Sequence, residues 1–211
     1  MNIMRDNFKL IRPLLKFESA DDFYFLQILQ RKKDGPGPNG IKITGTNNKS
    51  RAIKSYCIGS LDYFDKIEDE VKHLCTYFNA RAMIILAKKS YQKTALLHSC
   101  QVANHIMSNQ FENIKNCYWS SCAKSPSDDK YFLIDIDAED MDSLEMIKDT
   151  IENKVRNDKV PFGQRIKAEI PSRTGMHLIT HPFDARILLQ EYAKDKHEFV
   201  HTNGPTILYA P

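Results

Sequence analysis

One run of residues constrains the fold of this 211-residue chain most: Tyr131-Phe-Leu-Ile-Asp-Ile-Asp137. Its aromatic and β-branched side chains are typical of a strand. Side chains on a strand alternate between two faces, so Asp135 and Asp137 are expected to point one way and the apolar residues between them the other. The chain must therefore bury one face of this strand and leave two carboxylates together on the other.

The two carboxylates need a compensating charge. Their Cβ atoms would lie roughly 7 Å apart on a strand, a span that one or two divalent cations bridge through oxygen ligands. Without a cation the charges repel by about 1–2 kcal/mol at an effective dielectric of roughly 20–40. One interpretation of the pair is therefore a divalent-cation site. Its ordinary alternative is that polar residues gather where strands end, and that an acidic residue near Asp140 caps the next helix.

Composition indicates one domain spanning residues 1–211, with 42% hydrophobic and 27% charged residues. A formal charge of +3 is too small to indicate nucleic-acid binding, so any basic site must be local. No apolar run approaches the roughly 20 residues of a membrane span, and the N-terminus lacks a signal-peptide layout. We therefore expect a cytoplasmic protein without a membrane partner. Five cysteines without a C-x-x-C pair argue against a disulfide framework or a zinc ribbon.

Hydrophobic periodicity predicts an α+β fold of mixed β-sheet layers with packed helices. The aspartate pair places the candidate catalytic half around 131–211. The segment 111–129 has no sustained period and is predicted to be irregular. The expected helices cover 60–78, 90–108, 140–156 and 183–193. The expected strands cover 23–31, 52–58, 80–87, 131–137, 165–170, 176–180 and 206–209, and the hairpin 165–180 joins two of them.

The turn of that hairpin concentrates hydrogen-bond donors. Ser172-Arg-Thr-Gly175 leads directly to His177, so a hydroxyl, a guanidinium, freed backbone N–H groups and an imidazole fall within six positions. These groups bind phosphate oxygens. Gly175 permits a positive φ or a close approach, and Arg173 can grip a phosphate through two bonds. Taken alone, the turn is more typical of a plain hairpin with a half-buried histidine.

Together, the D-x-D strand and the S-x-x-G-x-H turn resemble the catalytic core of the archaeo-eukaryotic primase superfamily, the primase-polymerases. The resemblance covers residues 131–184, about a quarter of the chain. It implies a core similar to an RNA-recognition-motif (RRM) fold. It also implies that Asp135 and Asp137 bind Mg²⁺ or Mn²⁺, and that Ser172, Arg173 and His177 hold the phosphates of an incoming nucleotide.

The family carries a third acidic residue after the histidine motif. Asp184, in His181-Pro-Phe-Asp, is the nearest candidate for this metal ligand, although it lies close to His177, and Glu169 is a poorer one because it precedes the motif. The resemblance implies a nucleotidyltransferase of DNA replication in which Asp135, Asp137 and His177 are catalytic.

Its implied partners are nucleotides, single-stranded or template nucleic acid, and other replication proteins. The departure at the third acidic residue favours a second hypothesis. In that hypothesis the chain is a non-catalytic, nucleic-acid-binding replication-accessory protein of the same fold.

A competing motif lies near the C-terminus. His197-Glu-Phe-Val-His201 matches H-E-x-x-H, the zinc-binding helix of metalloproteases. None of the ten following residues is His, Asp, Glu or Cys, so a chance match is the better interpretation. A weaker alternative joins His177, His181, His197 and His201 into one metal cluster.

Basic residues form two groups that could follow a nucleic-acid backbone. Arg31, Lys32 and Lys33 lie beside a Gly/Pro loop, and Arg165 and Lys167 lie on the hairpin strand. Charge runs usually mark solvated faces, which is the interpretation we favour for Lys32 and Lys33.

Two single residues, Arg81 and Trp119, lie at positions where their side chains could have a specific role. Arg81 begins an expected strand, where it is placed to pair with a carboxylate or a phosphate. Trp119 is expected to plug the core rather than to stack on a base.

Overall fold

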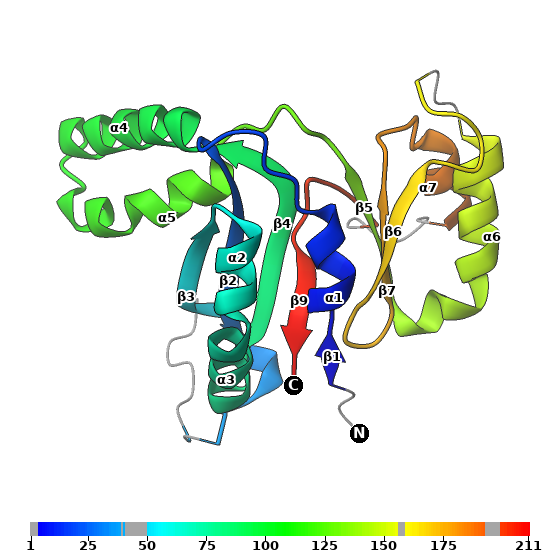
Figure 1. Cartoon of the computed structure of the whole chain (residues 1–211), viewed down its shortest axis with the longest axis horizontal. Coiled ribbons are helices and arrows are strands. Elements are labelled where there is room, and N and C mark those ends of the chain that lie inside the picture. The colour runs from blue at the N-terminus through cyan, green and yellow to red at the C-terminus, as the bar shows by residue number, and fades with distance from the viewer. Residues whose placement is uncertain (1–3, 39, 41–49, 156–158, 193–198) are drawn as a thin grey trace.

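The computed structural model describes residues 4–38, 40, 50–155, 159–192 and 199–211, which form two β-sheets with helices packed against them (Figure 1). The first sheet holds β1 (Arg5–Asp6), β2 (Asp22–Arg31), β3 (Ser50–Ile58), β4 (Arg81–Ser90) and β9 (Thr206–Ala210), in the order β1-β9-β4-β2-β3. The second holds β5 (Phe132–Ile136), β6 (Ile166–Pro171), β7 (Met176–Thr180) and β8 (Val200–Thr202), in the order β6-β7-β5-β8. The α+β class is confirmed. Within the described ranges every strand pair is antiparallel, so the expectation of mixed sheets is corrected.

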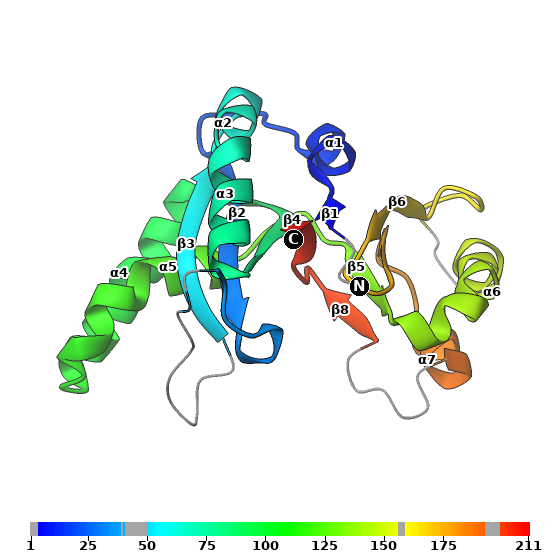
Figure 2. The ribbon, with the colours of Figure 1, turned by 90° about the horizontal axis from the view of Figure 1, so that it is seen from below.

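Two helical pairs cover opposite faces of the first sheet because β2 alternates its apolar side chains. Leu26 and Ile28 pack with Val71 beneath α2 (Leu61–Lys66) and α3 (Glu68–Phe78). Phe23 and Phe25 pack with Cys122 beneath α4 (Tyr91–Met107) and α5 (Ile114–Lys124). Figure 2 shows the two pairs on either side of β2 and β3.

The predicted single helix over 60–78 is two helices. Ser60 caps the first by accepting a hydrogen bond from the backbone N–H of Tyr63. Ile67, at φ −89° and ψ −4°, interrupts the helical path between α2 and α3. Asn79 ends the second helix in the left-handed conformation, at φ 48°.

The prediction that 111–129 is irregular is wrong, because a 3₁₀ turn (Phe111–Asn113) and α5 occupy most of it. The buried face of α5 carries small and polar residues, and these hide the helical period. Ser121 is fully buried and forms hydrogen bonds with the side chain of Gln101 and the carbonyl of Cys117. Trp119 lies on this helix with its ring centroid 6.5 Å from that of Phe25, but it is 40% exposed, so it covers the margin of this core instead of plugging it.

The second sheet follows the order β5-α6-β6-β7-α7-β8, a β-α-β-β-α-β arrangement with α6 (Leu144–Asp149) and α7 (Arg186–Tyr192) on its outer face. Ile134 and Ile136 pack with Ile147 and Leu188 against these helices. Leu133 points the other way and packs in the core that the two sheets share. The predicted alternation along β5 is therefore confirmed, and it turns the two aspartates toward the first sheet.

The N-terminal segment, with α1 (Phe8–Ile11), joins the two sheets. The side chain of Asn7 donates hydrogen bonds to the carbonyls of Pro171 and Ile207, each at 2.9 Å. Arg5 Nε donates to the carbonyl of Ser172 at 2.7 Å. These bonds fasten the Ser172–Gly175 turn to the first sheet. Among the helices of the described ranges, none has the length and apolar character needed to cross a bilayer.

Candidate functional site

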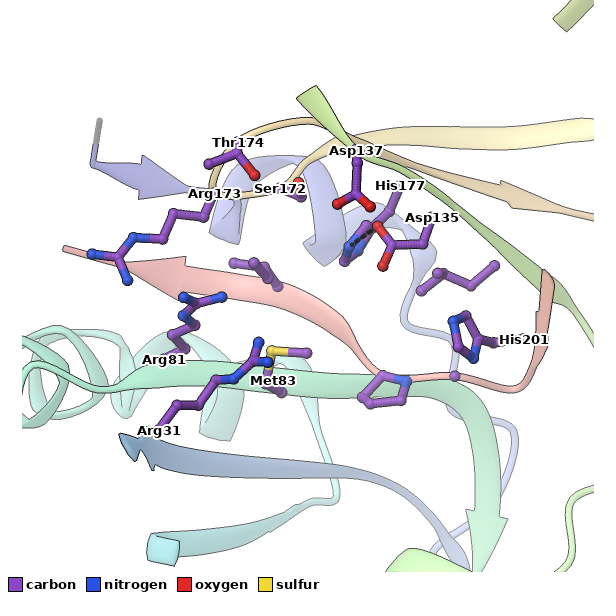
Figure 3. A pocket seen from close by; sticks show the side chains of 14 residues that line it. Arg31, Arg81, Met83, Asp135, Asp137, Ser172, Arg173, Thr174, His177 and His201 are labelled. Atoms are coloured by element: carbon purple, nitrogen blue, oxygen red, sulfur yellow. Dashed lines mark ion pairs between the residues drawn. The ribbon is translucent and has the colours of Figure 1, made fainter. Parts of the chain in front are cut away.

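A cavity of about 470 Å³ opens between the two sheets at the carboxyl end of β5 (Figure 3). Five residues singled out in the sequence line it together: Asp135, Asp137, Ser172, Arg173 and His177. They come from the end of β5, from the β6–β7 turn and from β7. We call this cavity the candidate site.

Asp135 and His177 are directly opposite each other on β5 and β7. His177 Nε2 lies 3.4 Å from Asp135 Oδ1, and its Nδ1 lies 2.9 Å from the hydroxyl of Thr206 on β9. The imidazole is 6% exposed and is held between the two sheets, with one edge toward the cavity. His177 therefore fixes the position of Asp135 while Asp137, at the strand end, remains exposed.

The pKa of Asp135 reflects two opposing influences. Burial raises it, while the hydrogen bond and the charge of His177 lower it, with weaker contributions from the charges of His201 and Arg31. The net result is a pKa below the ordinary value of 3.8. Because the folded pKa is depressed, the stabilisation is present above the unfolded pKa and is lost as pH falls through the folded pKa.

We predict that His177→Gln raises the pKa of Asp135, because the influence of burial remains when the imidazole is removed. Titration of the Asp135 carboxyl carbon by NMR measures this directly. His201→Gln is the matched control, and we expect it to produce a smaller rise. An Asp135 pKa that is unchanged in His177→Gln would contradict the proposed pairing.

The Ser172–Gly175 turn is closed by two local hydrogen bonds. The Gly175 N–H donates to Ser172 Oγ at 2.9 Å, and the Ser172 N–H donates to the Gly175 carbonyl at 3.0 Å. A Cβ atom on residue 175 would lie 1.9 Å from the carbonyl oxygen of Ile136, so glycine is required for close approach rather than for a positive φ. The turn therefore sits directly against the end of β5, beside the aspartates.

Three arginines line the same cavity as the aspartates: Arg31 and Arg81 lie on its opposite side, and Arg173 lies beside Ser172 (Figure 3). Arg31 ends β2, Arg81 begins β4, and Arg173 comes from the turn. Asp34, in the 3₁₀ turn Lys32–Asp34, joins two of them: its Oδ1 accepts from Arg81 Nη2 at 2.5 Å and from Arg173 Nη1 at 2.8 Å. The Asp34 side chain is only 4% exposed. It therefore orients two arginines that belong to different sheets.

We predict that Asp34→Asn lowers the free energy of unfolding by about 3 kcal/mol, because it leaves two largely buried guanidiniums without their anion. Thermal unfolding measures the loss. Added pyrophosphate should restore stability to this variant more than to the wild type, since it can occupy both guanidiniums. The matched control is Asp65→Asn, which breaks the exposed pair with Arg12 and should cost less than about 1 kcal/mol. Equal melting temperatures for Asp34→Asn and the wild type would refute the role of Asp34.

Two acidic candidates lie outside the candidate site. Asp184 follows β7 at the opposite end of the sheet, does not line the cavity, and forms an ion pair with Arg186. Glu169 on β6 pairs with Lys148 at 2.7 Å. The structure therefore does not bring Asp184 to the aspartate pair as a third metal ligand.

The zinc-helix alternative at H-E-x-x-H is not supported at His201. His197 lies outside the described residues, but His201 belongs to β8, where it is paired with Leu133 instead of lying on a helix. On an extended strand, residues four apart lie roughly 13 Å from each other, whereas the zinc motif needs its histidines one helical turn apart, roughly 6 Å. The four-histidine cluster fails as well, because His177 and His201 line the candidate site whereas His181 lines a different cavity.

The members of each predicted basic group lie in different environments in the structure. Arg31 lines the candidate site, and Lys32 is exposed. Arg165 is 2% exposed and donates to the carbonyls of Ile151 and Val155, so it holds the core together and cannot follow a nucleic-acid backbone. Lys167 remains exposed.

The carboxylates at the end of β5 are the groups that would hold the implied divalent metal. Asp135 and Asp137 point into the cavity from one face, and among the described residues neither pairs with a lysine or arginine. Two oxygen donors of this kind fit Mg²⁺ or Mn²⁺. The described ranges contain no group of three or more His, Cys, Asp or Glu side chains arranged to hold a metal ion. A metal here would complete its coordination with water or substrate oxygens.

Sequence reasoning missed Asp34 and Thr206. Both act through partners more than twenty residues away, and no local pattern predicts such pairs. No protein-family model, curated protein or solved structure matches this chain.

Proposed function

We propose that this chain is a metal-dependent nucleotidyltransferase of the primase-polymerase kind, acting on nucleotides and a single-stranded or template nucleic acid. One observation carries the proposal: two carboxylates on one strand, a Ser/Arg/His turn and three arginines line one cavity. The β-α-β-β-α-β order of the second sheet supports an RRM-like half of such a core. Replication is the process that the resemblance implies.

In this proposal the turn and the arginines bind the triphosphate. The hydroxyl of Ser172 accepts from Gly175 and keeps its own hydrogen for a phosphate oxygen. The N–H groups of Arg173 and Thr174 donate no hydrogen bond within the described ranges. Arg31 has no ion pair among the described residues and can offer a full charge. Backbone donors beside guanidiniums are a typical polyphosphate cradle.

Asp135 and Asp137 would hold Mg²⁺ or Mn²⁺. When bound, such an ion supplies charge neutralisation for the phosphates and lowers the pKa of an attacking hydroxyl. His177 keeps Asp135 ionised and oriented, as its 3.4 Å approach and the lowered pKa of Asp135 indicate. The residues of this chain would therefore act by positioning the reacting groups and by supplying charge.

A second candidate function is nucleotide or nucleic-acid binding without catalysis. It is favoured by the position of Asp184 away from the cavity, which leaves two carboxylates where the resembled family uses three.

One experiment separates the two functions. Purified protein is incubated with a single-stranded template, with and without a primer, and with labelled nucleotides in Mn²⁺ or Mg²⁺, with EDTA as control. Metal-dependent incorporation is the expected result. Saturable nucleotide binding without incorporation under any of these conditions would replace catalysis by the binding function, and absence of both would refute the proposal.

A further inference from the structure

A second cavity, of about 530 Å³, lies at the opposite end of the same strands. Strand β4 contributes Met83 to the candidate site and Leu86 and Lys88 to this second cavity. Tyr131, which immediately precedes β5, lines the second cavity, and Asp135, near the end of β5, lines the candidate site. The two cavities share no lining residue, so they are separate.

Cationic side chains dominate the polar lining of this second cavity, which we call the lysine cavity. Its four lysines and one histidine face two carboxylates, those of Glu18 and Asp129. Lys88 is already neutralised, since its Nζ lies 2.8 Å from Glu18 and 3.5 Å from Asp22. The cations are Lys16, Lys88, Lys130, Lys167 and His181.

Three of these lysines have no ion pair within the described ranges: Lys16, Lys130 and Lys167. The remaining carboxylate of the cavity, Asp129, offsets one of these three charges. An excess of two positive charges is left before any contribution from His181. Like charges gathered on a concave surface repel one another, and an anion that enters the cavity relieves the repulsion.

Two lowered pKa values show that the cations of the cluster lie close enough to influence one another. Partial desolvation lowers the pKa of Lys167, Asp129 opposes the effect, and Lys16 lowers it further. Partial burial lowers the pKa of His181, and Lys167 adds to that lowering. The charges of Lys16, Lys167 and His181 therefore act on one another, and at Lys167 the carboxylate of Asp129 outweighs the effect of Lys16.

The structure assigns the lysine cavity as a second binding site, for the phosphate groups of a nucleotide or of a nucleic-acid strand. Lys16, Lys130 and Lys167 are the charges that bind the phosphate, and Lys88 stays with its own carboxylates. Lysine ammonium groups bind phosphate as point charges without fixed geometry, which suits a site that follows a backbone. This site does not require the candidate site to be catalytic.

The test uses the full chain and a fluorescein-labelled 20-nucleotide oligothymidylate, with affinity measured by anisotropy at several salt concentrations. The double variant Lys16→Gln/Lys167→Gln should bind roughly tenfold more weakly, and its salt dependence should fall by about 0.7 for each lost phosphate contact. Lys115→Gln/Lys9→Gln, which removes two exposed lysines that line neither cavity, is the charge-matched control.

Two arms identify the source of the phosphate. In the first arm, the candidate site is disabled by Arg31→Gln/Arg173→Gln and dTTP is added to the bound oligonucleotide. If dTTP displaces the oligonucleotide from the lysine cavity, the ligand of this cavity is a free nucleotide. Resistance to dTTP would assign the strand. Equal affinity and equal salt slope for the double variant and its control, with dTTP binding also equal, would overturn the inference. Lys130→Gln, in an exposed connection before β5, repeats the test if the double variant does not fold.

Discussion

Asp135→Asn should reduce metal-dependent nucleotide incorporation by at least about a hundredfold. The substitution keeps the shape of the side chain and removes the charge that holds a divalent cation. It also removes the anion that faces His177 Nε2 at 3.4 Å. Asp137→Asn should have a similar effect on rate without that second change, since Asp137 has no ion pair within the described ranges. Single-turnover primer extension in Mn²⁺ measures both variants.

The control for these variants is Asp142→Asn. Asp142 is exposed in the 3₁₀ turn that follows β5, close in sequence to the pair, and it does not line the candidate site. We expect full activity from it. Mn²⁺ binding followed by electron paramagnetic resonance adds a readout independent of turnover, and it should weaken in Asp135→Asn and not in Asp142→Asn. Incorporation within threefold of wild type in Asp135→Asn would remove the aspartates from the site.

The sequence predicted best where a local period decides the structure. Alternation along β5 placed Ile134 and Ile136 in the core and both aspartates on the opposite face. The hairpin carrying Ser172 and His177 then follows β5 as an antiparallel neighbour, and cross-strand pairing brings His177 opposite Asp135. The D-x-D strand and the S-x-x-G-x-H turn therefore lie side by side, because neighbouring strands pair in a fixed register.

Sequence-based prediction failed where the structure depends on partners far apart in the chain, or where buried polar residues mask the helical periodicity. Asp34 lies in a Lys/Gly/Pro-rich loop, and only the folded chain shows that its carboxylate joins Arg81 to Arg173. The helix α5 buries Ser121, a residue that sequence patterns count as polar. The literal H-E-x-x-H match, which the missing downstream ligand already indicated to be chance, does not form a helix at His201, because β8 pairs at the edge of the second sheet there.

Gly175→Ala should destabilise the fold by about 3 kcal/mol, because the new Cβ would lie 1.9 Å from the carbonyl oxygen of Ile136. That neighbour is backbone of a central strand and cannot rotate away. For a chain of this length the loss corresponds to a fall in melting temperature of about 6–12 °C, measured by calorimetry. The turn must also shift away from β5, so nucleotide binding should weaken even below the melting transition.

Gly59→Ala provides the matched comparison for this effect. A Cβ at residue 59 would meet only the Tyr91 hydroxyl at 3.5 Å, an ordinary contact, and the backbone there has no positive φ. We expect a neutral change or a gain of about 0.4–1 kcal/mol, because alanine restricts the unfolded chain. A Gly175→Ala protein as stable as Gly59→Ala would show that the turn does not press against Ile136. The Ser172–Gly175 turn would then not be held beside Asp137, and the candidate site would lose the contact that assembles it.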